Sequence, residues 1–215
     1  MRLSARRPPE SFKDDGEAPP RPRPLLSRMA RIFDHDTLHS IAQEGIGQPF
    51  DAMLDALVDG LRRAYPGHIT ERPPNWIPSL AGGITGVMYV LHASLSEYLL
   101  VFGTPVSSEG FSGRYHIDVW DCVLSGRMDT YYCEDPSSAR AYAPGDTQLL
   151  GRGQTKGVYL APQTWLLECG QGPIITSLPM ALGDAVFSAL DGRILYETFK
   201  EYGRLALREL LRGKI

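Results

Sequence analysis

The stretch LAGGITGVMYVLHASLSEYLLVFG, residues 80–103, decides whether this chain crosses a membrane or folds as a sheet. It is close to the length of about 20 apolar residues that a membrane-spanning helix needs. His92 and Glu97 fall near its middle, where polar and charged groups are costly in lipid, and three glycines lie near its start. From Leu95 to Leu100 the residues fall into two alternating sets, which is typical of strands. We therefore expect paired strands here and no transmembrane segment in this chain.

Helical spacing of apolar residues precedes this stretch and returns near the carboxyl end. Between Asp34 and Tyr65 the spacing predicts two helices that stop at Pro66-Gly67. After the stretch, short runs rich in Val, Tyr, Leu and Thr are separated by turn signals such as Ser125-Gly126. The helical period resumes after Ser177. The chain is therefore predicted to be α+β, with an antiparallel β-barrel or jelly roll flanked by N-terminal helices and capped by amphipathic C-terminal helices.

Length and composition fit one globular domain with a tail. The 215 residues are 43% hydrophobic and 22% charged. Residues 1–31 hold eight Lys or Arg against four Asp or Glu, and six prolines lie between Pro8 and Pro24. Such a composition disfavours a packed core, so residues 1–33 are predicted to be a disordered, basic, proline-rich arm. The single domain then covers residues 34–215, with the barrel at about 80–176 and the C-terminal helices at about 177–212.

Charge and metal-ligating residues exclude several classes of function. The net charge is −3 and the pI about 6.0, so the molecule offers no broad basic field to nucleic acid. Three cysteines without CxxC or Cys/His spacing indicate a reducing compartment and no structural zinc site. His35 and His39 lie four apart on a predicted helix without a third ligand nearby, and no HxH motif occurs. We predict no metal site and no cofactor. The glycine-rich segment 151–157 lacks the ending of a phosphate-binding loop and is predicted to be a hairpin turn.

Glu168 is the strongest functional signal, because it is the one charged residue in VYLAPQTWLLEC, residues 158–169. A carboxylate in such an apolar strand must be paired, protonated or used. Strand alternation places Glu168 on the face of Leu166, opposite Trp165 and Leu167.

Asp121 occupies a comparable place in YHIDVWDCVL, residues 115–124. It shares a strand face with Val119, whereas Asp118 is expected at the rim. If Asp121 and Glu168 come within hydrogen-bond reach, they are expected to share one proton near neutral pH. Glu97 lies opposite Tyr98 in its strand and is predicted to accept structural hydrogen bonds, and His92 is predicted to pack in the core.

The last predicted helix carries a basic row beside an apolar one, which is Leu195, Phe199, Tyr202, Ala206 and Leu210. The basic row is Lys200, Arg204, Arg208 and Arg212. Such a row is typical of a helix that lies in a membrane interface and meets lipid headgroups. An ordinary solvated face is an equal alternative, because Glu197 and Glu201 lie within reach of Lys200 and Arg204 as helical pairs.

Several segments, in order, resemble the sigma non-opioid receptor and the fungal sterol C-8 isomerases. They are HASLSEYLLVFGTPVSSEGFSGRY (92–115), Asp121 before Ser125-Gly126, PGDT (144–147), TWLLECGQG (164–172) and ALGDAVFSALD (181–191). The resemblance runs from about Trp76 to Leu210. It implies a cupin-like barrel around an occluded pocket, C-terminal helices that lie on a membrane surface, and a homotrimer. It further implies an intracellular protein that is either peripheral to a membrane, the endoplasmic reticulum in a eukaryote, or cytoplasmic.

The resemblance also assigns a site. It implies that Glu168 is the carboxylate that binds a ligand ammonium in the receptor and is needed for isomerase chemistry, that Asp121 is its partner, and that Tyr98 hydrogen-bonds the glutamate. It matches the pocket walls to Met88, Leu100, Phe102, Val119, Leu178, Ala181 and Tyr202. Ile84 and Leu160 stand where the receptor has tryptophans in the pocket.

Two function classes follow from this site. The first is a cofactor-free sterol C-8 isomerase, in which Glu168 and Asp121 act as acid and base of split pKa to shift a ring double bond. The second is a non-catalytic, sigma-receptor-like binder of hydrophobic amines or lipids, because an ammonium ligand mimics the carbocation of the reaction. A structural trimer with a vestigial pocket is a weaker third reading. The same carboxylates serve the first two classes, so the sequence leaves the choice open.

Overall fold

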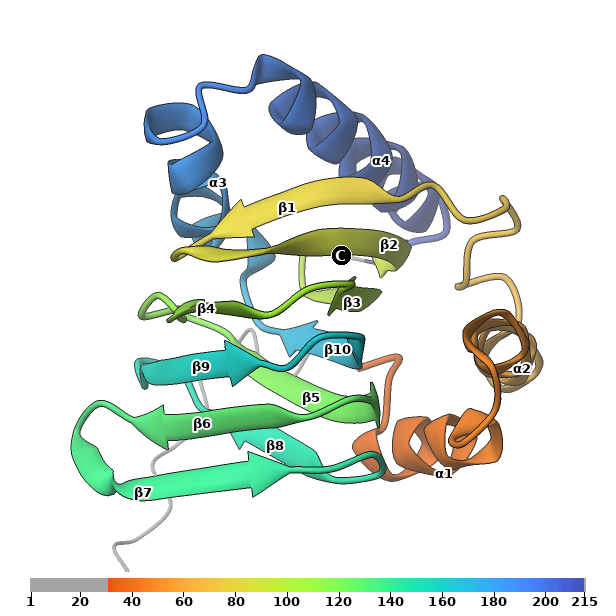
Figure 1. Ribbon diagram of the computed structural model, residues 1–215. Helices are drawn as coiled ribbons and strands as arrows, with labels where there is room; N and C mark the ends of the chain where they lie inside the picture. Colours follow the sequence, from red (N-terminus) through yellow and green to blue (C-terminus); the bar gives the residue numbers. More distant parts are fainter. Residues whose placement is uncertain (1–30, 215) are drawn as a thin grey trace, which may run out of the picture.

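The computed structural model describes residues 31–214, in which a helical pair, a run of strands and a second helical pair follow one another (Figure 1). The helices are α1 (His35–Gly45), α2 (Phe50–Ala64), α3 (Leu178–Phe187) and α4 (Gly192–Leu211), with a short 3-10 helix at Ile174–Thr176. The strands are β1 (Ile77–Ala81), β2 (Ile84–Ala93), β3 (Glu97–Thr104), β4 (Ser108–Phe111), β5 (Asp118–Ser125), β6 (Met128–Tyr132), β7 (Asp135–Tyr142), β8 (Thr147–Leu150), β9 (Lys156–Leu160) and β10 (Thr164–Gln171). This order confirms the predicted sequence of helices, strands and helices.

The strands form two antiparallel sheets that face each other as a cupin-like β-sandwich (Figure 1). The six-stranded sheet has the order β1-β2-β3-β10-β5-β8, and the four-stranded sheet has the order β4-β9-β6-β7. The predicted α+β class and antiparallel architecture are confirmed. The barrel is open between the two sheets, because no strand pair joins one sheet to the other among the described residues.

The stretch 80–103 forms strands, as predicted. Most of it is β2 and β3, which pair antiparallel with Met88 opposite Phe102, and a bulge between Val90 and His92 shifts the register. Every residue of β3 is buried, because both faces of this central strand are covered. Within residues 31–214 we find no helix that combines the length and the apolar character needed to span a bilayer.

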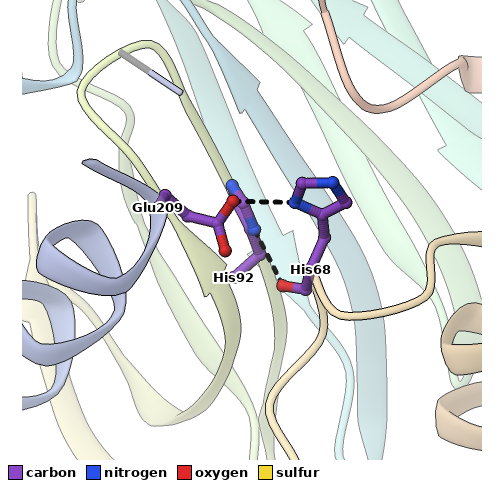
Figure 2. A group of neighbouring side chains, drawn as sticks. All are labelled: His68, His92 and Glu209. Carbon is purple, nitrogen blue, oxygen red and sulfur yellow. Dashed lines mark hydrogen bonds and ion pairs between the residues drawn. The ribbon is translucent and has the colours of Figure 1, made fainter. Parts of the chain in front are cut away.

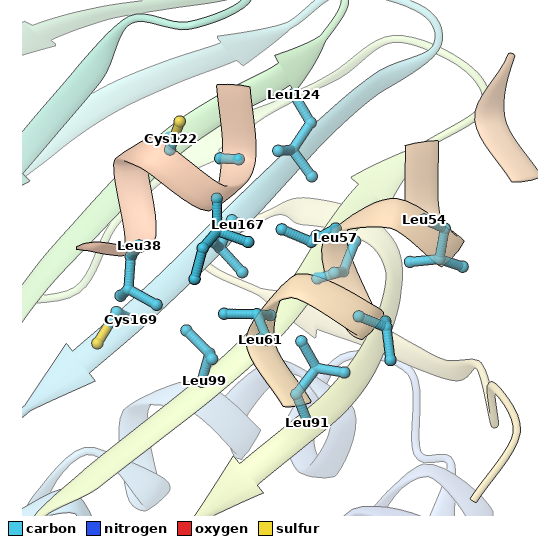
Figure 3. Packing of buried hydrophobic residues seen from close by; sticks show 14 of the residues in the cluster. Leu38, Leu54, Leu57, Leu61, Leu91, Leu99, Cys122, Leu124, Leu167 and Cys169 are labelled. Carbon is cyan, nitrogen blue, oxygen red and sulfur yellow. The ribbon is translucent and has the colours of Figure 1, made fainter. Parts of the chain in front are cut away.

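The helices α1 and α2 cover the outer face of the six-stranded sheet. Leucines of both helices pack against alternate residues of β2, β3, β5 and β10, as Figure 3 shows. The labelled members are Leu38, Leu54, Leu57, Leu61, Leu91, Leu99, Cys122, Leu124, Leu167 and Cys169. This core contains the residues on one face of each of these strands. The alternate residues therefore point into the space between the two sheets.

The amino end of the described chain is packed on the same face. Phe33 is buried in this core, and the backbone N–H groups of Ile32 and Phe33 donate to the Glu97 carboxylate. The remainder of the predicted arm, residues 1–30, lies outside the described residues.

The segment 151–155 corrects the prediction of a hairpin turn. The strand before it, β8, pairs with β5 in the six-stranded sheet, whereas β9 after it pairs with β4 and β6 in the other sheet. The glycines therefore mark a crossing from one sheet to the other. Turn residues indicate where a strand ends, but they carry no information about which strand the next one joins.

The helices α3 and α4 pack on β1 and β2 and close one end of the sandwich (Figure 1). The buried residues of α4 are Ile194, Thr198, Glu201, Leu205 and Glu209, so the buried face is offset from the apolar row seen in the sequence. Two apolar residues of that row, Phe199 and Leu210, are exposed instead.

Three of the four residues in the basic row of α4 contact the segment 67–70 of the domain. Arg204 donates to Thr70 Oγ1 and forms an ion pair with Glu201, Arg208 donates to the His68 carbonyl at 2.7 Å, and Arg212 donates to the Gly67 carbonyl. These three arginines fasten α4 to the segment 67–70. Lys200, in contrast, is exposed and pairs with Glu197. The two helical pairs expected for a solvated face, Glu197 with Lys200 and Glu201 with Arg204, are both present.

Candidate functional site

A cavity of about 190 Å³ lies between the two sheets and beneath α3 and α4. All twelve residues singled out from the sequence line it: Ile84, Met88, Tyr98, Leu100, Phe102, Val119, Asp121, Leu160, Glu168, Leu178, Ala181 and Tyr202. Most of the wall is apolar, so a charge inside it is poorly solvated. The structure brings the predicted residues together, and their chemical roles remain predictions.

Glu168 is positioned by the central strand of the larger sheet. β10 lies between β3 and β5, and Glu168 pairs with Asp121 on β5 and with Leu100 on β3. Leu166 lines the cavity together with Glu168, whereas Trp165 and Leu167 belong to the core beneath α1 and α2. The parity predicted from the sequence is therefore confirmed. The part of Glu168 that is not covered by protein faces the cavity.

Tyr98 holds the Glu168 carboxyl group. Its hydroxyl donates to Glu168 Oε1 at 2.6 Å. Tyr98 pairs with Gly170 across the β3–β10 ladder, and the tyrosine ring lies where a side chain at Gly170 would be. The missing side chain lets the ring cross β10 and reach the glutamate two residues away.

A Gly170→Ala substitution is expected to break this hydrogen bond. The added methyl group would lie 2.1 Å from Tyr98 Cε1, so the ring must move. We expect a loss of about 2 kcal/mol of unfolding free energy, as for other overpacked sites. The Glu168 pKa should rise, because the tyrosine bond lowers it. Carbon-13 NMR titration of labelled glutamate and urea unfolding measure both effects.

Gly183→Ala is the matched control for this variant. A methyl group there meets no atom within 4 Å, and the position lies in α3. Unchanged Glu168 titration in Gly170→Ala would contradict the role given to Tyr98.

Asp121 is held by a lysine that sequence reasoning missed. Lys156 Nζ lies 2.7 Å from Asp121 Oδ2 and 2.6 Å from Gln148 Oε1, and both charged side chains are buried. Gln148 in turn donates to Thr130 Oγ1 at 3.0 Å. No hydrogen bond joins Asp121 to Glu168 in the part of the chain that the structure describes, so the condition for a proton shared directly by the two carboxylates is not met here.

The charge balance of the cavity raises the pKa of Glu168. Burial, followed by repulsion from Asp121, raises it from 4.5 to about 7, while the Tyr98 hydrogen bond and the Lys156 charge act in the opposite direction. Asp121 is compensated by Lys156. The two carboxyl groups therefore differ: Glu168 exchanges a proton near neutral pH, and Asp121 takes part in an ion pair.

The cap of the cavity, which consists of α3 with its N-cap residue and α4, contributes polar groups without hydrogen-bond partners. Ser177 Oγ and Thr198 Oγ1 are buried and make no hydrogen bond, and both residues line the cavity. A buried hydroxyl group left unpaired costs free energy, so these two are available to a ligand. Tyr202 and Tyr115 also line the wall, and burial raises the pKa of Tyr115 to about 12, which keeps its hydroxyl neutral.

Other predicted residues lie outside the cavity. Asp118 does not line the cavity; it accepts from the Arg152 backbone at 3.1 Å and forms ion pairs with Arg152 and Arg31. Glu97 has the predicted structural role: besides the backbone of Ile32 and Phe33, it accepts from Gln171 at 3.0 Å and pairs with Lys214 at 2.9 Å. His92 is buried in the protein, as predicted.

Comparison with known proteins gives consistent results. A family model described as "ERG2 and Sigma1 receptor like protein" matches residues 24–214. The chain is 35% identical over 188 residues to the "Sigma non-opioid intracellular receptor 1" of Taricha granulosa, covering 87% of this chain and 84% of that protein. It is 37% identical over 168 residues to the "Protein erg2 homolog" of Dictyostelium discoideum, covering 76% of this chain and 70% of that protein.

Solved structures share a smaller part of the chain. A protein described as a predicted oxalate decarboxylase from Thermotoga maritima matches with a TM-score of 0.40 and 14% identity, over 48% of this chain and 97% of that one. The cupin domain of Schizosaccharomyces pombe Cnp3 matches with a TM-score of 0.37 and 14% identity, over 46% of this chain and 69% of that one.

Proposed function

Because the chain belongs to the ERG2 and Sigma1 receptor like protein family, we propose that it is a cofactor-independent isomerase that shifts a ring double bond of a sterol inside the cavity. One observation carries this proposal. Glu168 titrates near pH 7 in an apolar cavity, opposite a second carboxylate that is held in an ion pair. A group that both gives and takes a proton at neutral pH suits acid–base chemistry.

The proposed reaction moves the double bond from position eight to position seven. The Glu168 carboxyl group gives its proton to C9, and the alkene electrons form the new C–H bond, which leaves a carbocation at C8. Asp121 then removes a proton from C7, and the electrons of that C–H bond form the new double bond. Asp121 then gives its proton to solvent and Glu168 takes one from solvent, so no oxidant, reductant or cofactor is consumed.

The cavity is suited to the cationic intermediate. After proton transfer Glu168 is negatively charged, and its charge acts on the carbocation with little screening by water. Tyr98 donates to the glutamate in this state and keeps the carboxylate in place. Lys156 balances Asp121 and prevents two free negative charges from meeting in the empty cavity.

Binding of hydrophobic amines without catalysis is the second candidate. The resemblance to the receptor implies an ammonium group beside Glu168. Its positive charge would favour the ionised form of the Glu168 carboxyl group. Lys156 weakens this candidate, because it already neutralises Asp121 and leaves one carboxylate for the ammonium. We therefore favour the isomerase.

The unpaired hydroxyl groups indicate where the polar end of a substrate would lie. Ser177 and Thr198 can hydrogen-bond the hydroxyl group of a sterol while the ring system contacts the apolar wall. The cavity of about 190 Å³ is smaller than the roughly 300 Å³ at the lower end for ligand pockets, so α3 and α4 must move outward to admit such a substrate.

The experiment that tests the function is conversion of a sterol with its double bond at position eight. Purified wild-type protein should form the product with the bond at position seven, without added cofactor. Absence of product, together with tight binding of a cationic amphiphile that Glu168→Gln abolishes, would support the binder instead.

We propose further that the protein lies on a membrane through an apolar surface of α3, α4 and their connection. Large apolar side chains are exposed there: Val186, Phe187, Leu190, Tyr196, Phe199, Leu207, Leu210 and Leu211. Phe187 is 85% and Leu211 81% exposed. Exposed apolar residues in this number favour a lipid surface, into which a sterol also partitions.

Replacing Phe187, Leu190 and Leu211 together with serine should weaken binding to phosphatidylcholine liposomes by about 100-fold or more, because each side chain contributes roughly 1.5 kcal/mol when buried. Sedimentation with liposomes measures the effect. Val106→Ser, an exposed apolar residue between β3 and β4, is the control. Equal sedimentation of the triple variant and the wild type would contradict the proposal.

We also propose a homotrimer, as the resemblance to the sigma non-opioid receptor implies. Light scattering coupled to gel filtration measures the mass directly. We expect three chains of 23.8 kDa per particle, and a stable monomer would contradict this.

A further inference from the structure

We propose that His68, His92 and Glu209 form a binding site for a divalent transition metal ion, with zinc as the expected ion. One ligand atom from each residue lies within 4.8 Å of those from the other two (Figure 2). The residues come from three separate segments: the turn after α2, strand β2 and the last turn of α4. This site is distinct from the cavity, whose lining includes none of the three.

His92 supplies a free lone pair. Its Nδ1 lies 2.9 Å from the carbonyl oxygen of His68, and a carbonyl can only accept, so Nδ1 carries the proton. Nε2 is then the unprotonated nitrogen. It is buried and has no hydrogen-bond partner, and the residue as a whole is 0% exposed. An imidazole that donates one nitrogen to a backbone carbonyl and directs the other into a polar cluster has the arrangement of a metal ligand.

Glu209 supplies a buried carboxylate. Its side chain is 0% exposed, and Oε2 lies 2.7 Å from His68 Nδ1 (Figure 2). The other oxygen, Oε1, is contacted by Arg208 at 3.3 Å and Arg212 at 3.6 Å. The arginines therefore orient the carboxylate, and they leave Oε2 directed at the two histidines.

His68 is the ligand that can adjust. Its side chain is 32% exposed, whereas the other two ligands are held within the protein. Two ligands at about 2.1 Å from a tetrahedral zinc ion lie about 3.4 Å apart. Zinc binding would therefore replace the 2.7 Å hydrogen bond between His68 and Glu209 and disturb few other contacts. Binding through Nδ1 releases the proton that this nitrogen now donates to Glu209.

The donor set selects the class of ion. Two imidazoles and one carboxylate suit zinc and neighbouring transition metals, while magnesium and calcium prefer oxygen ligands throughout. The nearby charges of Arg208 and Arg212 oppose a cation, so we expect weaker binding than at a site made of cysteine thiolates.

Bound zinc would fasten the end of α4 to β2 and to the turn after α2. α4 also carries Tyr202 and Thr198 of the cavity wall. The ion would therefore stabilise the closed position of the cap that a substrate must displace. We expect saturating zinc sulfate to raise the melting temperature of the full chain by about 5 °C, and magnesium sulfate to leave it unchanged.

Equilibrium dialysis of the full chain against zinc sulfate, followed by elemental analysis, tests the site. The wild type should bind one zinc per chain. His68→Asn and Glu209→Gln should each weaken binding by more than about 100-fold. Controls are His116→Asn, an exposed histidine, and Cys133→Ser, a partly exposed thiol. Circular dichroism without zinc establishes that the variants are folded.

X-ray absorption provides a readout that does not depend on stability. The spectrum should show nitrogen and oxygen neighbours at about 2.0–2.1 Å and no sulfur. The proposal is overturned if the wild type takes up no stoichiometric zinc, if His68→Asn and Glu209→Gln bind it as tightly as the wild type, or if sulfur is found in the coordination shell.

Discussion

Replacing Glu168 with glutamine is expected to lower the rate of sterol isomerisation by about a thousandfold, within the range that a positioned acid or base contributes. Glutamine has nearly the same shape and can still accept the hydrogen bond from Tyr98, which lies at 2.6 Å in the wild type. It has no proton to give at C9. The substitution therefore removes the acid proton and keeps the shape of the side chain. Product formation at saturating sterol measures the loss of rate.

Asp118→Asn is the control for this variant. It makes the same chemical change to a carboxylate that does not line the cavity and that accepts from the Arg152 backbone. We expect activity within about twofold of the wild type, as for a surface substitution away from the site. If Glu168→Gln kept more than a tenth of the wild-type rate, Glu168 could not be the acid.

The Glu168→Gln substitution should also remove a pH dependence of the unfolding free energy. The folded chain raises the pKa of Glu168 from 4.5 to about 7 and so binds this proton more tightly than the unfolded chain. The unfolding free energy should therefore fall as the pH rises from about 4.5 to about 7, by roughly 3 kcal/mol in total. The isomerisation rate should fall over the upper part of this range, as the protonated acid is lost. Urea unfolding at pH 5 and pH 8 should show a smaller difference in Glu168→Gln.

Replacing Lys156 with methionine is expected to have the largest effect on stability. It removes the one cation 2.7 Å from Asp121 and leaves a buried carboxylate without a partner. Losing one member of a buried ion pair costs about 3–5 kcal/mol. The two carboxyl groups of the cavity would then hold one proton between them, which is the arrangement that the sequence alone suggested for the wild type. Urea unfolding at pH 8 measures the loss, which should shrink at pH 5.

Two further variants separate charge from packing. Lys200→Met removes an exposed lysine that forms a surface pair with Glu197 and should cost less than about 1 kcal/mol. Adding Asp121→Asn to Lys156→Met should restore much of the stability, because the Asp121 carboxylate that lost its partner is then removed. If the double variant were as unstable as Lys156→Met, the effect would come from lost packing and not from the ion pair.

The position of the proposed acid and base, Glu168 and Asp121, could be predicted from the sequence, because strand geometry is local. Strand alternation alone places Glu168 and Leu166 on the face that points away from the core beneath α1 and α2. It also places Asp121 and Asp118 on opposite faces of their strand. The registers between β10 and its neighbours agree with this. The ion pair between Lys156 and Asp121 could not be predicted in the same way. The glycine-rich context of Lys156 predicts a turn, whereas alternation with Val158 and Leu160 in β9 places its side chain on the cavity face.

The carboxyl-terminal helix was harder to predict, because its buried face contains charges. Glu201 and Glu209 are buried through their contacts with arginines of the same helix. A prediction that turns apolar residues inward therefore assigns the wrong face: it buries Phe199, which is exposed in the structure. The histidine cluster depends on three segments that only the tertiary fold brings together, and no spacing within one element reveals it.

Isomerisation of a sterol with its double bond at position eight, carried out in deuterium oxide, tests the central claim most directly. Glu168 exchanges its proton with solvent, so the wild type should place one deuterium at C9 of each product molecule, and Glu168→Gln should form almost no product. A product without solvent deuterium would show that the proton does not come from an exchanging acid such as Glu168. Absence of product from the wild type would contradict the proposed isomerase.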